Sequence, residues 1–329
     1  MTRLALAVDG GNSKTDLALV REDGELLALV RGPMSSPHHL GLEGALDVVE
    51  TLLAQAAAQA GLGSVRADVG ALLIAGADFA DEEEDVRHAA TERGWAERIW
   101  VGNDTFAVLR AGTDRGWGVA VVCGAGINCV GVAPDGRHAR FLSLGEITGD
   151  WGGGYDVGLA AVSAAARSED GRGPRTSLEG LVPAHFELDT PTDLAEAIHR
   201  GRIPQRRVVE LAPVVLAAAA DDAVAAEIVA RLEDEIATMA LTAIRRLDLE
   251  GPIEVLVGGG LVRAAGTTLV DAVAGALAAD GTLVDVRACA LPPIAGAALL
   301  GLDRLDATED AKVRLRDEIA AAMEEVAVG

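Results

Sequence analysis

The segment LALAVDGGNSKTDLALV, residues 4–20, decides the fold. It joins two apolar runs through the Gly-rich loop DGGNSKT, and an Asp-Gly turn at residues 23–24 leads into a third run. The same order returns at residues 119–142, where GAGIN separates two apolar runs and Pro-Asp-Gly forms the later turn. Short apolar runs divided by such turns predict β-hairpins. Glycine has no Cβ atom, so the amides of these loops can approach an anion. Two loops of one design favour two halves of a phosphate site over two ordinary hairpins.

Composition narrows the class of protein. At 329 residues the chain suits two domains, and half of it is hydrophobic, so core material is ample. The net charge of -23 argues against nucleic-acid and anionic-membrane partners, because phosphate groups select basic surfaces. The three cysteines have no metal-binding spacing, and the first residues lead straight into a strand rather than a secretion signal. We therefore expect a cytoplasmic protein with reduced thiols and no membrane segment.

Strands that alternate with helices predict an α/β protein, and the hairpin that opens each half predicts mixed rather than parallel sheets. A polar stretch at 111–116 marks the domain boundary. We expect a first domain at 1–112, completed by a C-terminal helix at 303–329, and a second domain at 113–302. Helices are predicted at 41–60, 81–92, 157–168, 222–248, 266–279, 294–300 and 308–326.

Five short motifs follow one another, and neither a Walker A loop nor a Rossmann fingerprint is among them. They are DGGNSKT at 9–15, NDT at 103–105, GAGIN at 124–128, GDWGGGY at 149–155 and VGGG at 257–260. In this order the chain resembles the N-acetylglucosamine kinase and BadF-type ATPase branch of the sugar kinase, Hsp70 and actin superfamily. The resemblance implies two actin-like ATPase domains of the ribonuclease H-like fold, with mixed sheets around a central cleft.

The resemblance also implies a nucleotide site with ATP and Mg²⁺ as cofactors. Asp9 would orient the metal ion, through water because Mg²⁺ keeps much of its hydration shell; a solvated turn residue is the alternative. The residues implied in phosphate and adenosine binding are Gly10, Gly11, Asn12, Ser13, Lys14, Thr15, Gly124, Ala125, Gly126, Gly258, Gly259 and Gly260. Ala125 and Ile127 stand where the family more often has hydroxyl residues, so the second loop would rely on its backbone amides.

A sugar site is implied next to the phosphate loops. Asp104 would be the general base that accepts the proton of the attacking hydroxyl, and helix capping is its alternative role. The residues implied in substrate binding are Ser36, Asn103, Asp104, Asn128, Asp150 and Trp151. Trp151 replaces the usual glutamate, and its ring could stack on a sugar or lie in the core.

The leading interpretation is an ATP-dependent kinase that converts N-acetylglucosamine to its 6-phosphate. Glucosamine or another hexose is the alternative within the same chemistry. A BadF-type activator would instead need an iron–sulfur cluster held by clustered thiolates, which the cysteine spacing does not favour. A catalytically silent sugar-binding regulator would have little reason to keep Asp104. The expected partners are an amino sugar and ATP, and a homodimer is also considered.

Overall fold

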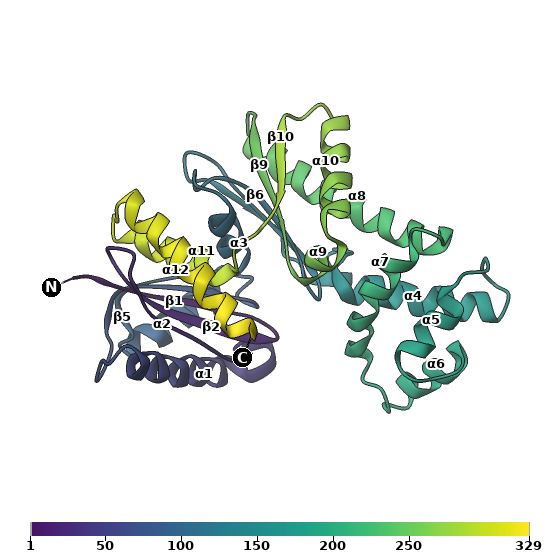
Figure 1. The fold of residues 1–329 in the computed structure, drawn as a ribbon, viewed down its shortest axis with the longest axis horizontal. Helices are drawn as coiled ribbons and strands as arrows, with labels where there is room; N and C mark the ends of the chain where they lie inside the picture. Colours follow the sequence, from purple (N-terminus) through teal and green to yellow (C-terminus); the bar gives the residue numbers. More distant parts are fainter. Residues whose placement is uncertain (1, 329) are drawn as a thin grey trace. The chain divides into compact units, whose positions relative to one another are not determined.

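The computed structural model describes residues 2–328, with side chains up to residue 323. The chain forms two compact units: unit 1 comprises Met1–Trp117 and Cys289–Gly329, and unit 2 comprises Gly118–Ala288. Each unit contains a five-stranded sheet with helices packed on it, as the ribbon in Figure 1 shows. Parallel and antiparallel pairs occur in both sheets, so the predicted α/β class with mixed sheets is confirmed.

The sheet of unit 1 has the strand order β3-β2-β1-β4-β5. The strands are β1 (Leu4–Gly10), β2 (Lys14–Arg21), β3 (Leu26–Pro33), β4 (Ala67–Ile74) and β5 (Ala96–Gly102). β2 runs antiparallel to both β1 and β3, while β1, β4 and β5 are parallel. The carboxyl ends of β1, β3, β4 and β5 therefore share one edge of the sheet.

The helices of unit 1 cover both faces of this sheet. They are α1 (Pro37–Gln59), α2 (Ala80–Glu92), α3 (Thr105–Gly112), α11 (Pro293–Arg304) and α12 (Glu309–Val328). Successive strand residues point to opposite faces, so Leu6 and Val8 pack with α1 and α2 while Ala5 and Ala7 pack with α11 and α12. In Figure 1, α12 and α1 accordingly lie on opposite sides of the strands. Asp9 continues the series of Ala5 and Ala7, so it faces the side that α11 covers.

The sheet of unit 2 has the order β10-β9-β6-β7-β8, and its parallel strands β6, β9 and β10 end at one edge. The strands are β6 (Gly118–Cys123), β7 (Ile127–Val132), β8 (His138–Arg140), β9 (Ile253–Gly258) and β10 (Val284–Ala288). The helices are η1 (Gly145–Ile147), α4 (Gly153–Glu169), α5 (Leu178–His185), α6 (Pro191–His199), η2 (Gln205–Leu211), α7 (Ala212–Ala218), α8 (Ala223–Leu247), α9 (Gly260–Ala265) and α10 (Thr267–Ala279). α8 begins where the side chain of Asp222 accepts hydrogen bonds from two amides of its first turn.

The largest differences from the sequence prediction concern α1, α4 and the second domain, and α1 begins at Pro37 rather than at residue 41. α4 begins at Gly153 rather than at residue 157, because glycines in its first turn fit closely against the loop after β6. Residues 289–302 were assigned to the second domain, yet α11 packs on β1 and α3 of unit 1. Gly296 permits this contact, since a Cβ there would lie 1.8 Å from the carbonyl oxygen of Ala107. Within residues 2–328, no helix combines the length and apolar character needed to cross a membrane.

Candidate active site

Acidic side chains gather at the edge of unit 1 where β1, β4 and β5 end. Asp9 lies at the end of β1, Asp78 follows β4, and Asp104 follows β5. In open α/β sheets, ligands bind beyond the carboxyl ends of the strands. Asp78 raises the pKa of Asp104, and Asp104 in turn raises that of Asp9, so the three carboxylates are electrostatic neighbours. This edge brings together the two residues predicted for the metal and for the general base.

Asp9 belongs to a cross-strand row of charges. It pairs in register with Asp16 of β2, which pairs in turn with Arg31 of β3. Asp16 is almost fully buried, and it accepts hydrogen bonds from Arg31 Nε at 2.6 Å and from Lys14 Nζ at 2.8 Å. The predicted phosphate contact of Lys14 stays a prediction, because its amine is bound to Asp16 here.

Burial raises the pKa of Asp9 to about 8, and the charges of Asp104 and Asp16 add to that increase. Lys14 and Arg31 oppose it, but both are bonded to Asp16 rather than to Asp9. Asp9 is thus a half-buried carboxylate whose ionised form lacks a full counter-charge. A bound cation is the ligand that such an environment favours.

Asp104 does not cap the helix that it precedes. Its side chain makes no capping hydrogen bond to α3. Asn103 caps the helix instead: its Oδ1 accepts hydrogen bonds from the amide of Thr105 at 3.1 Å and from the Thr105 hydroxyl at 2.8 Å. The amide nitrogen of Asn103 donates to Asp78 Oδ1 at 2.8 Å, which fixes the turn. Asn103 was predicted to bind substrate, and these contacts give it a structural role as well.

The pKa of Asp104 is raised to about 6, first by burial and then by the charge of Asp78. The amides of Asp104 and Thr105 counter part of that increase. A carboxylate with a pKa near 6 is ionised at neutral pH, yet it is a stronger base than an ordinary aspartate. Its environment therefore suits proton acceptance.

Ser36 carries a buried hydroxyl that has no hydrogen-bond partner among the described residues. It precedes α1 without capping it, whereas the hydroxyl of neighbouring Ser35 accepts a hydrogen bond from Thr15 at 2.8 Å. Gly76, in the loop after β4, has φ +85°, and a Cβ there would lie 3.0 Å from Ser36 Oγ. Buried polar atoms are nearly always paired, so an unpaired hydroxyl calls for an explanation. A ligand hydrogen bond at this predicted substrate residue supplies one.

The first predicted phosphate loop is a tight turn between β1 and β2. The amide of Gly11 donates to the carbonyl of Lys14 at 2.9 Å and closes it. Asn12 and Ser13 are exposed, and their amides have no partner among residues 2–328. Thr15 lies inward, bonded to Ser35. The loop thus presents two amide donors to solvent, as a phosphate site requires.

The second loop, between β6 and β7, is held from behind by α4. The amides of Gly154 and Tyr155 donate to the carbonyls of Gly124 and Ala125 at 2.8 and 2.9 Å. Ala125 and Gly126 are exposed, and across the described residues their amides bind no other group. Because amides of α4 bind the carbonyls of Gly124 and Ala125, the open side of the loop presents amide donors. This arrangement suits an anion despite the missing hydroxyl side chains.

The glycines after β9 meet the end of β6. Gly259 has φ +105°, and a Cβ there would lie 2.1 Å from the carbonyl oxygen of Cys123. Any larger residue would push the two strand ends apart. The segment 258–260 thus lies beside the second loop within unit 2, and its contact with adenosine stays a prediction.

Three further predicted substrate residues lie in unit 2. Asn128 Oδ1 accepts a hydrogen bond from Ser143 Oγ at 2.7 Å, and Asp150 accepts one from the Thr148 hydroxyl. The Trp151 ring lies 4.0 Å from the guanidinium carbon of Arg231 and lines a pocket between α4 and α8. Sugar contacts by these residues stay predictions.

Two residues of the unit 1 site were missed in the sequence. Asp16 is an acid inside an otherwise apolar strand, which is itself a sign of a function or a buried ion pair. Asp78 follows a buried strand at the edge where Asp9 and Asp104 lie. Its position could have been inferred once β4 was recognised as parallel to β1.

The family model for BadF/BadG/BcrA/BcrD ATPases matches residues 6–301. The chain belongs to this family. It is therefore an ATP-dependent enzyme, and the predicted resemblance is confirmed.

Named relatives are kinases. An N-acetylmuramic acid/N-acetylglucosamine kinase of Clostridium acetobutylicum is 30% identical over 214 residues, which span 65% of this chain and 70% of that protein. An N-acetyl-D-glucosamine kinase of Dictyostelium discoideum is 28% identical over 57% of this chain and 62% of its own length. A crystal structure of a proposed N-acetylglucosamine kinase from Chromobacterium violaceum matches with a TM-score of 0.72 at 25% identity, covering 91% of this chain and 99% of that one.

A more distant structure shows the breadth of the fold. The glucokinase of the ROK family from Streptomyces griseus, in complex with glucose and AMPPNP, has a TM-score of 0.54 at 16% identity, with 91% of this chain and 99% of that chain covered. The architecture of two mixed-sheet domains is thus shared with sugar kinases.

Proposed function

We propose that this ATP-dependent carbohydrate kinase phosphorylates an amino sugar, with N-acetylglucosamine as substrate and its 6-phosphate as product. The observation that carries the proposal is the state of Asp104. Asn103, rather than Asp104, makes the capping hydrogen bonds of α3, and the pKa of the Asp104 carboxyl is raised to about 6. The named functions of the two curated relatives supply the class of sugar.

In the proposed reaction, Asp104 accepts the proton of the sugar 6-hydroxyl as that oxygen attacks the γ-phosphorus. The new oxygen–phosphorus bond forms, the bond between the γ-phosphorus and its bridging oxygen breaks, and ADP leaves with the electron pair. Phosphoryl transfer depends mainly on positioning and on stabilising charge. The exposed amides of Asn12 and Ser13 in unit 1, and of Ala125 and Gly126 in unit 2, are the donors assigned to the phosphates.

Mg²⁺ fits the chemistry of Asp9. Among the side chains described, no group of three or more His, Cys, Asp or Glu residues forms a metal cage. Mg²⁺ rarely uses such a cage in nucleotide enzymes; it is held by one or two carboxylates, by water and by substrate phosphates. Asp9, with its pKa raised to about 8, would be that carboxylate. The ion would neutralise charge on the phosphates, and Asp9 would hold it at the end of β1.

Ser36 is assigned to the sugar. Its unpaired buried hydroxyl can donate to a sugar oxygen or accept from a sugar hydroxyl. A site whose polar group is left unpaired without substrate discriminates strongly against analogues that cannot bond to it. This gives unit 1 a recognition group as well as a base.

The placement of the cysteines does not favour a BadF-type electron-transfer role. Cys123 and Cys129 lie inside strands of unit 2, and burial raises the pKa of both, to about 12 for Cys123. An iron–sulfur cluster needs several cysteine ligands at one place, and among the described side chains no group of three or more His, Cys, Asp or Glu is placed to hold a metal ion. Cys289 belongs to unit 1 and donates its thiol hydrogen to the carbonyl of Leu291 at 3.3 Å.

A coupled ADP-release assay over a panel of sugars tests the proposal. The panel contains N-acetylglucosamine, N-acetylmuramic acid, N-acetylmannosamine, glucosamine and glucose. We expect the highest kcat/KM with N-acetylglucosamine. ADP release that no sugar accelerates would reject the kinase proposal, and a preference for glucose would reject the amino sugar alone.

A further inference from the structure

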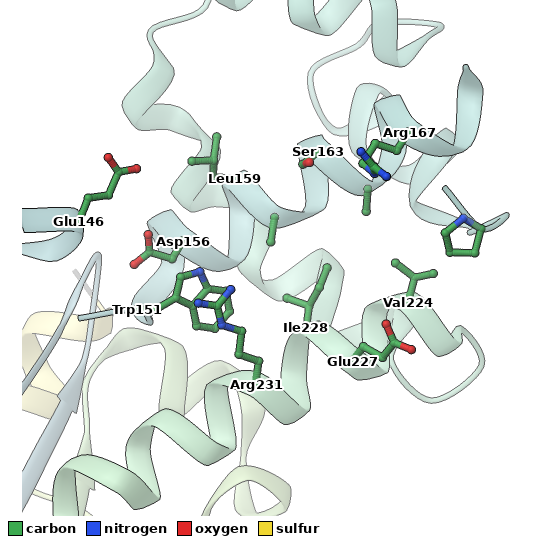
Figure 2. Close-up of a pocket in the computed structure, with 13 residues that line it drawn as sticks. Glu146, Trp151, Asp156, Leu159, Ser163, Arg167, Val224, Glu227, Ile228 and Arg231 are labelled. Atoms are coloured by element: carbon green, nitrogen blue, oxygen red, sulfur yellow. The ribbon is translucent and has the colours of Figure 1, made fainter. Parts of the chain in front are cut away.

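Unit 2 contains a pocket that begins at Trp151, a predicted sugar-binding residue, and extends away from the phosphate loop. It has a volume of about 530 Å³ and lies between α4 and α8 (Figure 2). Ligand pockets in proteins commonly have volumes of roughly 300–1,000 Å³. The pocket runs along α4 from Trp151 and Asp156 to Arg167, well beyond the glycines of the phosphate loop. Its size and length suit a separate small ligand.

Both ends of the pocket carry charged side chains, with Arg167 and Glu227 at the end away from Trp151, and the middle differs from them. The middle is apolar, lined by Leu159, Ala160 and Ala164 of α4 and by Ile228 of α8. At the Trp151 end, Asp156, Glu146 and Arg231 supply both signs of charge, and in Figure 2 the Arg231 guanidinium overlaps the Trp151 ring with Asp156 next to it. A ligand with a polar head and an apolar body would match this division.

Arg231 is the unusual member of this cluster. Its guanidinium carbon lies 4.0 Å from the centre of the Trp151 ring, and it makes no ion pair or hydrogen bond with any residue that the structure describes. Stacking on tryptophan holds the guanidinium plane while its N–H donors stay available. A guanidinium held in this way is suited to a carboxylate, which it can bind through two parallel hydrogen bonds.

The acids exclude a simple anion. Burial raises the pKa of Asp156, and the charge of Glu146 adds to that increase, while the amide of Gly152 and Arg231 lower it. With Glu227 also lining the pocket, three carboxylates face two arginines. A simple anion would be repelled by the acids, and a simple cation would be repelled by Arg231, whose charge acts on both Asp156 and Glu235. A ligand with both charges on its head satisfies both sets of groups.

We propose that this pocket binds a free α-amino acid with a large apolar side chain. The α-carboxylate would pair with Arg231, the α-ammonium with Asp156 and Glu146, and the side chain would lie between Leu159 and Ile228. The proposal concerns binding alone and stands whether or not the enzyme phosphorylates an amino sugar.

The pocket is connected to the second phosphate loop through a short path. Asp156 Oδ2 accepts a hydrogen bond from the amide of Gly152 at 3.0 Å. The next residue, Gly153, fits so closely on Gly126 that a Cβ would lie 2.4 Å from its carbonyl carbon. A ligand that engages Asp156 therefore acts on the segment that supports the loop, and linkage makes its effect on nucleotide affinity reciprocal.

Isothermal titration calorimetry of the full chain tests the proposal with L-phenylalanine as probe. L-phenylalaninamide lacks the carboxylate, and N-acetyl-L-phenylalanine lacks the ammonium. We expect one molecule of L-phenylalanine to bind per chain. Both analogues should bind at least about tenfold more weakly, because each lacks one of the two charged groups that the pocket would bind by hydrogen bonds. Absence of binding, or equal binding of all three probes, would overturn the proposal.

Two variants locate the site. Arg231→Gln removes the charge from an exposed side chain and should weaken L-phenylalanine binding at least about tenfold. Arg246→Gln is the matched control, because Arg246 also lies on α8 and stacks on an aromatic ring, Phe141 at 5.4 Å, outside the pocket. The control variant should bind L-phenylalanine with the same affinity as the unsubstituted protein. Unchanged binding by the Arg231 variant, or an equal loss in both variants, would refute this assignment.

Discussion

Asp104→Asn separates the catalytic role of this residue from its role in the fold. The variant keeps the size of the side chain but cannot accept a proton at neutral pH. The side chain of Asn103 supplies the capping bond to the amide of Thr105, so α3 keeps this bond in the variant. We therefore expect a folded protein with a slow chemical step. General-base contributions are on the order of 10²–10⁴-fold, so kcat should fall by about a hundredfold or more.

The pKa of Asp104 also predicts the effect on stability, including its sign. The folded-state pKa is raised from 3.8 to about 6, so this group stabilises the fold only below about pH 4, and that contribution is lost as the pH rises through 6. Above pH 7 the ionised side chain is destabilising by up to about 3 kcal/mol, since one pKa unit corresponds to about 1.4 kcal/mol. Asparagine removes this penalty. The Tm of the variant at pH 7.5 should equal or exceed that of the parent by a few degrees.

Two measurements check this prediction together. ADP release at saturating sugar gives kcat, and thermal unfolding followed by circular dichroism gives Tm at pH 5 and at pH 7.5. The parental kcat should also rise as the pH increases through about 6, where Asp104 ionises. Near-parental kcat in a folded variant would refute the assignment of the base. A large drop in Tm would show that Asp104 supports the fold after all.

Three other substitutions test the remaining parts of the site. Asp9→Asn should raise the Tm of the metal-free protein at pH 9, because the contribution of Asp9 to stability is lost as pH rises through its pKa of about 8. The same variant should weaken the Mg²⁺ dependence of kcat, and an unchanged metal dependence would contradict the proposal. Ser36→Ala should raise the KM for the sugar. Its Tm should change little, because no described residue forms a hydrogen bond with the Ser36 hydroxyl. An unaltered KM would show that Ser36 does not bind the sugar. Gly259→Ala should destabilise unit 2 by several kcal/mol, because the new Cβ would contact Cys123. Gly281→Ala is the control: Gly281 has φ +83° with open space around it, so this change should cost only about 1–2 kcal/mol. Equal losses of Tm in the two variants would show that the contact with Cys123 is unimportant.

The sequence predicted the fold class because its hairpins are local. The loops after Gly10 and Cys123 join strands that are neighbours in both chain and sheet, so alternation and glycine placement sufficed. Residues 289–302 were assigned to the wrong side of the observed unit boundary for the opposite reason. α11 packs on β1, which lies almost three hundred residues earlier, and no local pattern reports such a contact.

The candidate site was predictable in position but not in detail. Strand ends located Asp9 and Asp104 from the motif order. The division of labour between Asn103 and Asp104 depends on side-chain hydrogen bonds, and either residue is a common helix cap. The lack of a partner for Ser36 likewise depends on three-dimensional packing, as does the stacking of Arg231 on Trp151.

The central claim is that this chain transfers the γ-phosphate of ATP to the 6-hydroxyl of N-acetylglucosamine. Nuclear magnetic resonance of the reaction products tests it most directly, with ¹³C-labelled sugar, ATP and Mg²⁺. Coupling between phosphorus and carbon 6, with one sugar phosphate formed for each ADP, is the predicted result. ADP formed together with inorganic phosphate and unmodified sugar would contradict the claim.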